Sequence, residues 1–295
     1  MPTFVLMFKS IIFSTILWSL LLLTSCEDET APAVAYLEVT ELRVAAKASE
    51  GTSSSRLNTI WVEQNGQQIG AFSPPCRIPV YAGENQSLRF IPGMSLNGVY
   101  SQRNQYEMLS TIEKNWTLNE GSTRVLSPEV LTFEYNPTYT LMIIEDFDGI
   151  GLNYNRTVQS DTNLLITSDT SEVFSFPGEL PNKSGKFVLL PVSLGEFKTL
   201  QAFELPKYGA NVWLEVNYKT EVALTFGVTA NEILQSIKTP VVTLFPNEEW
   251  NKVYINLVTE VSGYPNALDY NLFFGGINTT DDTATVLIDN IKLLY

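Results

Sequence analysis

The sequence contains no histidine, only two cysteines and few charged residues, and each shortage excludes a class of function. Charged side chains make up 17% of the 295 residues. Without histidine, neither a Ser-His-Asp or Cys-His triad nor a zinc site with imidazole ligands can form. The 18 Lys and Arg residues are outnumbered by 32 Asp and Glu residues, for a net charge of −14. Because binding to phosphate backbones depends on Lys and Arg, this balance argues against a nucleic-acid partner.

Apolar residues, by contrast, are plentiful. Hydrophobic residues account for 44% of the chain and aromatic residues for 12%. This is enough apolar surface to form a packed core, so we expect a folded protein rather than a disordered one. Domains usually contain about 100–200 residues, so the length predicts two of them.

Residues 1–25 have the pattern of a secretory signal peptide. Lys9 is the only charged residue among them, and an apolar run follows from Ile11 to Leu23. The alternative is a membrane-spanning helix, which needs about 20 apolar residues and fits this shorter run less well. We therefore expect this segment to be removed and the protein to lie outside the cytoplasm, with Met1 or Met7 as the start of translation.

The apolar run ends at Leu23-Thr24-Ser25-Cys26, which resembles the lipobox of bacterial lipoprotein signal peptides. The resemblance implies that Cys26 is lipidated and becomes the first residue of the mature chain, whose charge is −15 after the loss of Lys9. Such acyl chains anchor a protein to a membrane, because each buried CH₂ contributes about 0.8 kcal/mol. Cys76 is then left without a partner, and we expect it to be a small buried residue.

Residues 26–35 form an acidic lipidated tether in this interpretation. The triplet Glu27-Asp28-Glu29 resembles the export signals that follow the lipidated cysteine in surface lipoproteins of Bacteroidetes. The resemblance implies an outer-membrane lipoprotein exposed on the cell surface. An anchor that faces the periplasm is the alternative.

Beyond residue 35 the pattern is typical of β-strands, and we predict an all-β fold. Apolar and polar residues alternate with a period of two from Tyr36 to Val44, and short strands recur at about the spacing of a β-sandwich. Asn65-Gly66 is a strong hairpin signal. Pro137 marks a boundary, which predicts two β-sandwich domains at 36–136 and 137–295. The single helical candidate covers 231–237.

The first domain resembles small Ig-like domains of the PEGA or carboxypeptidase-regulatory type. The residues that carry the likeness are Ile60-Trp-Val-Glu-Gln-Asn-Gly-Gln-Gln-Ile-Gly70, Pro79-Val-Tyr-Ala-Gly83 and Leu88-Arg-Phe-Ile-Pro-Gly93. The resemblance implies a spacer or interaction module without catalysis.

The second domain resembles the galactose-binding-like jelly roll of many carbohydrate-binding modules. The likeness rests on Ile144-Glu-Asp-Phe-Asp148, Trp213-Leu-Glu-Val-Asn-Tyr218, Leu224-Thr-Phe-Gly-Val228 and the last strand, Ile288-Asp-Asn-Ile-Lys-Leu-Leu-Tyr295. A fold does not by itself define a function. The resemblance implies a jelly roll that is able to hold glycan.

Acidic residues at the first and last strands of this domain suggest a structural calcium ion. Ca²⁺ binds six to eight hard oxygen atoms from carboxylates and carbonyls. Jelly rolls of the resembled type often hold calcium where these two strands lie side by side. The matching residues here are Glu145 or Asp146 together with Asp289. The alternative is that these are solvated acids without a metal.

Aromatic side chains are candidates for stacking against sugar rings. The residues we expect to bind ligand are Tyr264, Trp213, Tyr218 and Trp250. The alternative is that they pack in the core or at sheet edges, as most Trp and Tyr residues of a sandwich do. Tyr264 lies in the loop-like stretch Ser262-Gly-Tyr-Pro-Asn266, which favours exposure.

The sequence favours a non-catalytic, membrane-anchored binding or adhesion module outside the cytoplasm, with glycan as a candidate ligand. The alternative is a structural or assembly lipoprotein of the envelope that binds a protein partner. A glycoside-acting enzyme is less favoured, because without histidine it would depend on a carboxylate pair alone. We expect no cofactor other than calcium.

Overall fold

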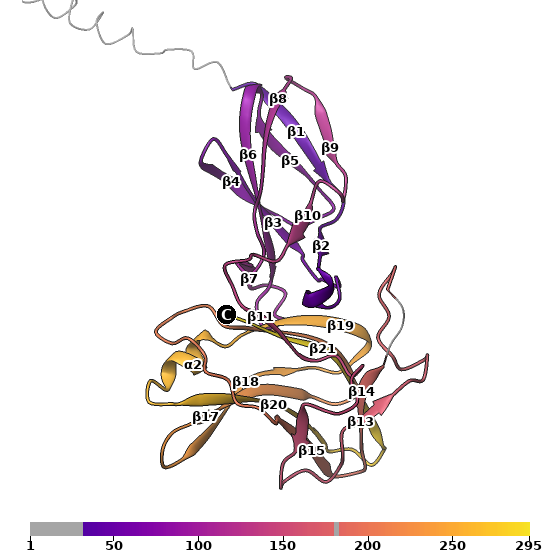
Figure 1. Ribbon diagram of the computed structural model, residues 1–295. Coiled ribbons are helices and arrows are strands. Elements are labelled where there is room, and N and C mark those ends of the chain that lie inside the picture. Colours follow the sequence, from indigo (N-terminus) through magenta and orange to yellow (C-terminus); the bar gives the residue numbers. More distant parts are fainter. Residues whose placement is uncertain (1–31, 180–182) are drawn as a thin grey trace, which may run out of the picture.

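The computed structural model describes residues 32–179 and 183–295 and confirms the all-β prediction (Figure 1). The signal segment, Cys26 and the acidic triplet lie outside the described residues. Within the described ranges, no helix is long and apolar enough to cross a membrane. Among the described residues, the helices are a 3₁₀ turn, η1 (Ala48–Glu50), and a short α-helix, α2 (Val258–Gly263).

The first β-sandwich is built from residues 34–134. One sheet has the order β5-β1-β9, with β1 (Val34–Val39), β5 (Cys76–Tyr81) and β9 (Thr123–Leu126). The other has the order β4-β3-β6-β7, and β8 also pairs with β6; its strands are β3 (Thr59–Gln64), β4 (Gln67–Phe72), β6 (Gly83–Ser95), β7 (Arg103–Gln105) and β8 (Ile112–Leu118). A separate parallel pair joins β2 (Arg43–Ala45) to β10 (Thr132–Glu134).

The predicted alternation explains this core. Ala35, Leu37 and Val39 on β1 are fully buried, while the residues between them point away from the core. Cys76 at the start of β5 is a free, half-buried cysteine that packs against the same core. Burial raises the pKa of its thiol, which disfavours the reactive thiolate.

The second β-sandwich contains two larger antiparallel sheets. The six-stranded sheet contains β11 (Leu141–Glu145), β13 (Leu165–Thr167), β14 (Ser184–Leu189), β16 (Trp213–Thr220), β19 (Asn247–Asn256) and β21 (Ala284–Leu294). The five-stranded sheet contains β12 (Tyr154–Arg156), β15 (Ser193–Thr199), β17 (Leu224–Asn231), β18 (Ser236–Leu244) and β20 (Asp269–Asn278). The main apolar core lies between these two sheets.

The helix predicted at 231–237 is wrong, because this segment forms the turn of the β17–β18 hairpin. The backbone N–H of Glu232 donates to the carbonyl of Gln235 at 2.8 Å. The Ser236 hydroxyl donates to the Asn231 side chain, also at 2.8 Å, and closes the turn. Asn and Ser favour turns over helix interiors.

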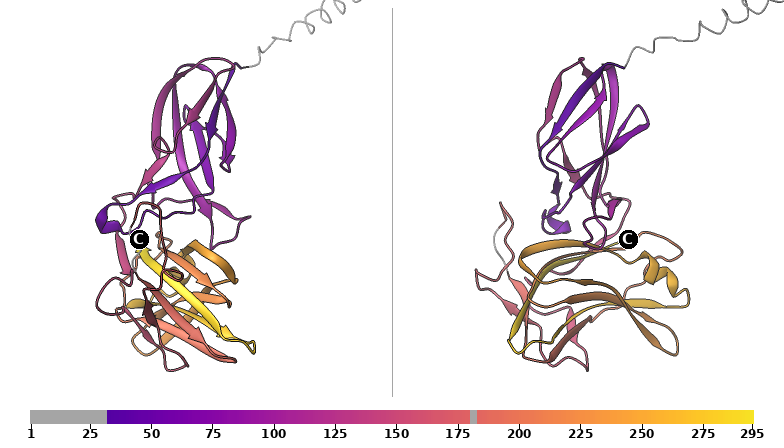
Figure 2. Two further views of the ribbon diagram at one scale, coloured as in Figure 1. Left: turned by 90° about the vertical axis from the view of Figure 1, so that its right-hand side faces the viewer. Right: turned by 180° about the vertical axis from the view of Figure 1, so that it is seen from behind.

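The two sandwiches are joined by a shared apolar core. The first sandwich stands on the outer face of the six-stranded sheet, as the two further views show (Figure 2). Three large side chains of the second sandwich, Trp213, Tyr254 and Leu294, are buried in the apolar cluster of the first. The first sandwich is therefore packed against the second rather than only linked to it.

Candidate functional site

The outer face of the six-stranded sheet carries the most distinctive polar residues of the molecule. Side chains alternate across a strand, so Trp250, Lys252 and Tyr254 of β19 all point outward. On the neighbouring β16, Glu215 pairs with Tyr254 and Asn217 pairs with Lys252 across the strands. This face is apolar where the first sandwich covers it, charged in its middle and open beyond.

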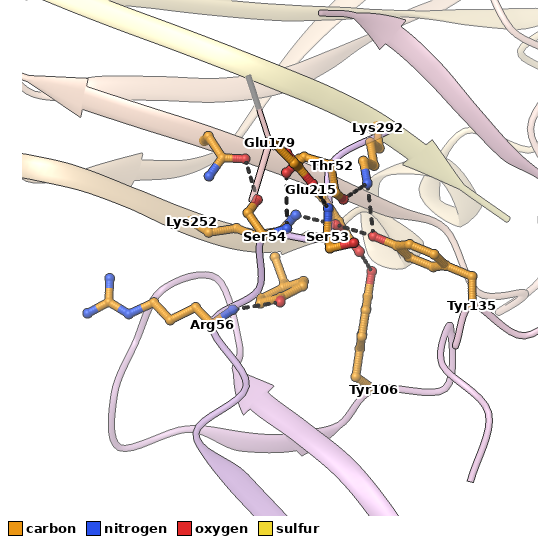
Figure 3. Close-up of polar contacts among 12 residues, drawn as sticks. Thr52, Ser53, Ser54, Arg56, Tyr106, Tyr135, Glu179, Glu215, Lys252 and Lys292 are labelled. Atoms are coloured by element: carbon orange, nitrogen blue, oxygen red, sulfur yellow. Dashed lines mark hydrogen bonds and ion pairs between the residues drawn. The ribbon is translucent and has the colours of Figure 1, made fainter. Parts of the chain in front are cut away.

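The charged middle is a buried cluster that joins both sandwiches (Figure 3). The carboxylate of Glu215 accepts hydrogen bonds from the hydroxyls of Tyr106 at 2.6 Å and Tyr135 at 3.0 Å. It also forms an ion pair with the Lys252 ammonium at 2.6 Å. The Lys292 ammonium donates to the Tyr135 hydroxyl at 3.2 Å. These partners offset the cost of removing the charges from water.

The pKa shifts follow from this arrangement. Burial alone would raise the pKa of Glu215, but the nearby ammonium groups of Lys252 and Lys292 bring it below its usual value. The pKa of Lys292 is lowered to about 7. Burial is the largest cause, repulsion from Lys252 acts in the same direction, and attraction from Glu215 opposes both. The carboxylate therefore stays ionised, while Lys292 loses its proton near neutral pH.

A segment of the first sandwich, residues 52–56, crosses this face, and we call it the strap. The backbone N–H of Arg56 donates to the Tyr254 hydroxyl at 3.0 Å. The Ser54 hydroxyl donates to the Asn217 side chain at 3.2 Å. These bonds fix the strap to strands β16 and β19, so residues from both sandwiches form one wall of the open region.

The open region is a groove with a cavity volume of about 530 Å³. Trp250 and Phe174 meet there edge to face, with ring centroids 5.4 Å apart. Asn251 lies between the outward residues Trp250 and Lys252, and its side chain points to the inner face, where it donates to the Tyr218 hydroxyl at 3.3 Å. The lining is completed by further residues of the strap, of the 174–176 loop and of β16 and β19: Ser54, Ser55, Arg56, Ser175, Phe176, Asn217, Asn247, Glu248, Glu249 and Lys252.

This lining combines aromatic rings with hydrogen-bonding groups. A ring face offers apolar contact, while amide and hydroxyl groups bond to polar substituents at fixed directions. The groove is therefore suited to a ligand that has both apolar faces and hydroxyl groups.

The four aromatic residues expected to bind ligand lie in different places. Trp250 lines the groove, but Trp213 is 2% exposed and packs edge to face on Tyr106 between the sandwiches. Tyr218 is 6% exposed and belongs to the main core, with only its hydroxyl bonded to Asn251 at 3.3 Å. Burial therefore leaves Trp213 and Tyr218 without a free ring face.

Tyr264 also lies away from the groove. Its ring is half-buried against the main core, and its hydroxyl pairs with the Thr239 hydroxyl at 2.8 Å. Of the loop-like stretch 262–266, Ser262 and Gly263 belong to α2 and Tyr264 follows the helix, with its ring folded back onto the protein. Of the four expected residues, Trp250 is the one that lines the groove.

The acids proposed for calcium are close in the fold but engaged by other groups. The Glu145 carboxylate accepts the backbone N–H groups of Phe147 at 3.0 Å and Asn153 at 2.5 Å. The Asp289 carboxylate accepts the Ser184 hydroxyl at 2.6 Å. Over residues 32–179 and 183–295, no three His, Cys, Asp or Glu side chains form a group able to hold a metal. Glu145 and Asp289 thus each have a protein partner, and calcium binding by them stays a prediction.

Asp146 is placed differently from Glu145. Together with Asp148 and Asp289 it borders a small cavity of about 30 Å³. The pKa of Asp289 is raised to about 8, chiefly by burial, with a smaller contribution from the charges of Asp148 and Asp146. This cavity is the nearest counterpart to the predicted site, and calcium binding stays a prediction.

A second groove lies on the outer face of the five-stranded sheet, with a cavity volume of about 570 Å³. Its walls include Leu194 and Ile277 on one side and Pro240 on the other. Glu196 is buried at its floor and forms an ion pair with Lys238. This groove is mainly apolar and contains neither Trp nor Tyr.

The chain is similar to several solved structures of known proteins. No protein-family model matches the chain, and no curated protein matches it in sequence. The family 11 carbohydrate-binding module of the cellulase Lic26A-Cel5E of Clostridium thermocellum is similar at 13% identity and a TM-score of 0.35, over 52% of this chain and 94% of that chain. The CBM22-1 xylan-binding domain from Paenibacillus barcinonensis Xyn10C is similar at 12% identity and a TM-score of 0.37, over 52% and 93%.

A third similar structure is the enzymatically active domain of tailspike protein 4 of bacteriophage CBA120. It has 14% identity and a TM-score of 0.38, over 58% of this chain and 25% of that chain. One fold supports many functions, so the ligand of this chain depends on its own side chains.

Sequence reasoning missed most of the groove. The strap residues Ser54 and Arg56 come from the first sandwich, and Phe174 comes from a loop without a strand pattern. The outward row of β19 had a detectable signal, because Trp250, Lys252 and Tyr254 alternate with the apolar residues Val253 and Ile255. No pattern in the sequence indicates that the strap lies across this row.

Proposed function

We propose that this protein is a lipid-anchored lipoprotein outside the cytoplasm that binds glycan without catalysis, in the groove between its two sandwiches. The observation that supports this most directly is the lining of the groove. It places the Trp250 ring in one cavity with the amide groups of Asn217 and Asn247 and the hydroxyl groups of Ser54 and Ser55. Sugars present both apolar ring faces and hydroxyl groups, which matches this combination. The anchor part of the proposal rests on the lipobox at Cys26.

A glycan array tests the proposal, using the soluble chain that begins after Cys26. We expect binding to at least one glycan and a loss of about tenfold or more in affinity for Trp250→Ala, since each 1.4 kcal/mol of lost contact is tenfold. Tyr208→Ala is the matched control, because Tyr208 is 86% exposed and lies outside the groove. The proposal fails if no glycan binds, or if both variants bind as the wild type does.

The apolar groove on the five-stranded sheet favours a second function, docking of a protein partner in the cell envelope. Exposed apolar side chains lie at or beside this groove, with Ile277 at 59%, Val192 at 80% and Phe245 at 83% exposure. Exposed apolar patches often mark protein interaction sites. Chemical crosslinking in the envelope, compared between wild type and Ile277→Glu, tests this function. A crosslinked partner lost in the variant would support it, and unchanged crosslinks would contradict it.

A further inference from the structure

The chemical nature of the groove's ligand is indicated by an exposed cation at its wall. Lys252 and Lys292 are both buried, at 6% and 1% exposure. In the described part of the chain, Glu215 is the one carboxylate that forms an ion pair with either of them. Lys252 is therefore paired, and Lys292 lies outside the lining of the groove, so neither ammonium group is free to bind a ligand there.

Arg56 is the exposed cation at the wall of the groove. The backbone N–H of Arg56 donates to the Tyr254 hydroxyl, and this bond fixes the position of the Arg56 backbone over the sheet. Its side chain is exposed, and among the described residues no carboxylate forms a salt bridge with it. A guanidinium fork is suited to binding a carboxylate through two parallel hydrogen bonds.

Two acids oppose this charge at the edge of the groove. Glu248 and Glu249 line it, but both are exposed to solvent. Exposed charges are screened by water and salt, so these two carboxylates oppose an anionic ligand only weakly.

We propose that the groove selects acidic glycans, with a uronate carboxylate bound to Arg56 and a sugar ring of the same chain lying on Trp250. This inference rests on the proposed glycan-binding function and specifies its ligand class. Arg56 is then the residue that determines specificity, and Trp250 supplies contact that acidic and neutral sugars share.

The test compares acidic polysaccharides with their carboxyl-reduced, neutral forms. Oligosaccharides of polygalacturonate, alginate and hyaluronan, each with its reduced counterpart, are titrated calorimetrically into the soluble chain. We expect at least one acidic form to bind about tenfold or more tightly than its reduced form, as loss of a charge-assisted hydrogen bond implies. Arg56→Gln should abolish this preference, while Arg156→Gln on β12, far from the groove, should keep it.

The possible results separate the two proposals. Equal binding of acidic and reduced forms, or an unchanged preference in Arg56→Gln, overturns the acidic selectivity and leaves glycan binding in place. Absence of binding to every form overturns both. Glu248→Gln should tighten binding of the acidic form only, because it removes a repulsive charge, and weaker binding in this variant would contradict the charge argument. Unchanged melting temperatures verify that each variant is folded.

Discussion

At the residue scale, Glu215 explains how the two sandwiches tolerate buried charge between them. Its carboxylate is 1% exposed, and it receives two tyrosine hydroxyls and one ammonium group. Replacing a buried ion pair by apolar residues can be neutral, but removing one partner leaves the other uncompensated. The cluster therefore depends on this one carboxylate more than on any single hydrogen bond.

Glu215→Gln should lower the free energy of unfolding by about 3–5 kcal/mol, because it leaves two buried lysines without a counter-charge. Urea unfolding measures the loss. Glu113→Gln is the matched control, since Glu113 is exposed and lies 3.8 Å from Arg89. We expect that control to change stability by about 0–1 kcal/mol. Similar midpoints for the two variants would contradict the role assigned to Glu215.

The lowered pKa of Lys292 predicts that the stability of the fold depends on pH. Its pKa is lowered to about 7 in the folded protein, against about 10.4 in an unfolded chain. Between these two values the unfolded chain binds more protons, so the contribution of Lys292 to stability increases as pH rises from about 7 to about 10. Unfolding free energies measured at pH 7 and pH 9 should show a smaller rise in Lys292→Met than in the wild type. Identical rises would rule out a lowered pKa.

At the scale of elements, strands were predictable and the direction of their side chains was not. The alternation in 213–218 and the apolar residues of 250–256 predict strands, and β16 and β19 confirm them. Both faces of the six-stranded sheet are covered in its middle, one by the main core and one by the first sandwich. Aromatic residues are therefore buried on both faces, and hydrophobicity alone does not distinguish the buried Trp213 from Trp250 at the groove.

The first and last strands of the second sandwich give the test for calcium. Strands β11 and β21 pair side by side. Asp146 directly follows β11, and Asp289 lies within β21. If calcium binds at the acidic cavity between them, EGTA should lower the melting temperature, because a ligand of the folded state stabilises it. Asp289→Asn should remove that sensitivity. An EGTA-independent melting temperature in the wild type would count against the metal.

At the scale of the whole molecule, the two sandwiches form one unit with a groove at their junction. The strap at 52–56 reaches partners on β16 and β19, far along the chain. The boundary near Pro137 is a prediction from the sequence, because breaks between strand patterns are local. Packing between sandwiches depends on contacts over long sequence separations, and for this reason the interface and half of the groove could not be predicted.

The shared core has a consequence for stability. Trp213→Ala should remove the ring that packs on Tyr106 and weaken the contact between the sandwiches, at a cost of about 3–5 kcal/mol. Small-angle scattering should then show a more extended particle than the wild type. Phe245→Ala is the control, because Phe245 is 83% exposed and should leave the scattering unchanged. Unchanged scattering in both variants would show that other contacts hold the sandwiches together.

The most direct test of the central claim asks which groove holds glycan. A glycan selected on the array is titrated calorimetrically into the wild type, into Trp250→Ala at the junction of the sandwiches, and into Thr225→Tyr, which fills the groove on the five-stranded sheet. We predict a loss of about tenfold or more in Trp250→Ala and wild-type affinity in Thr225→Tyr. Wild-type affinity in Trp250→Ala with loss of binding in Thr225→Tyr would contradict the claim and place the ligand on the opposite sheet.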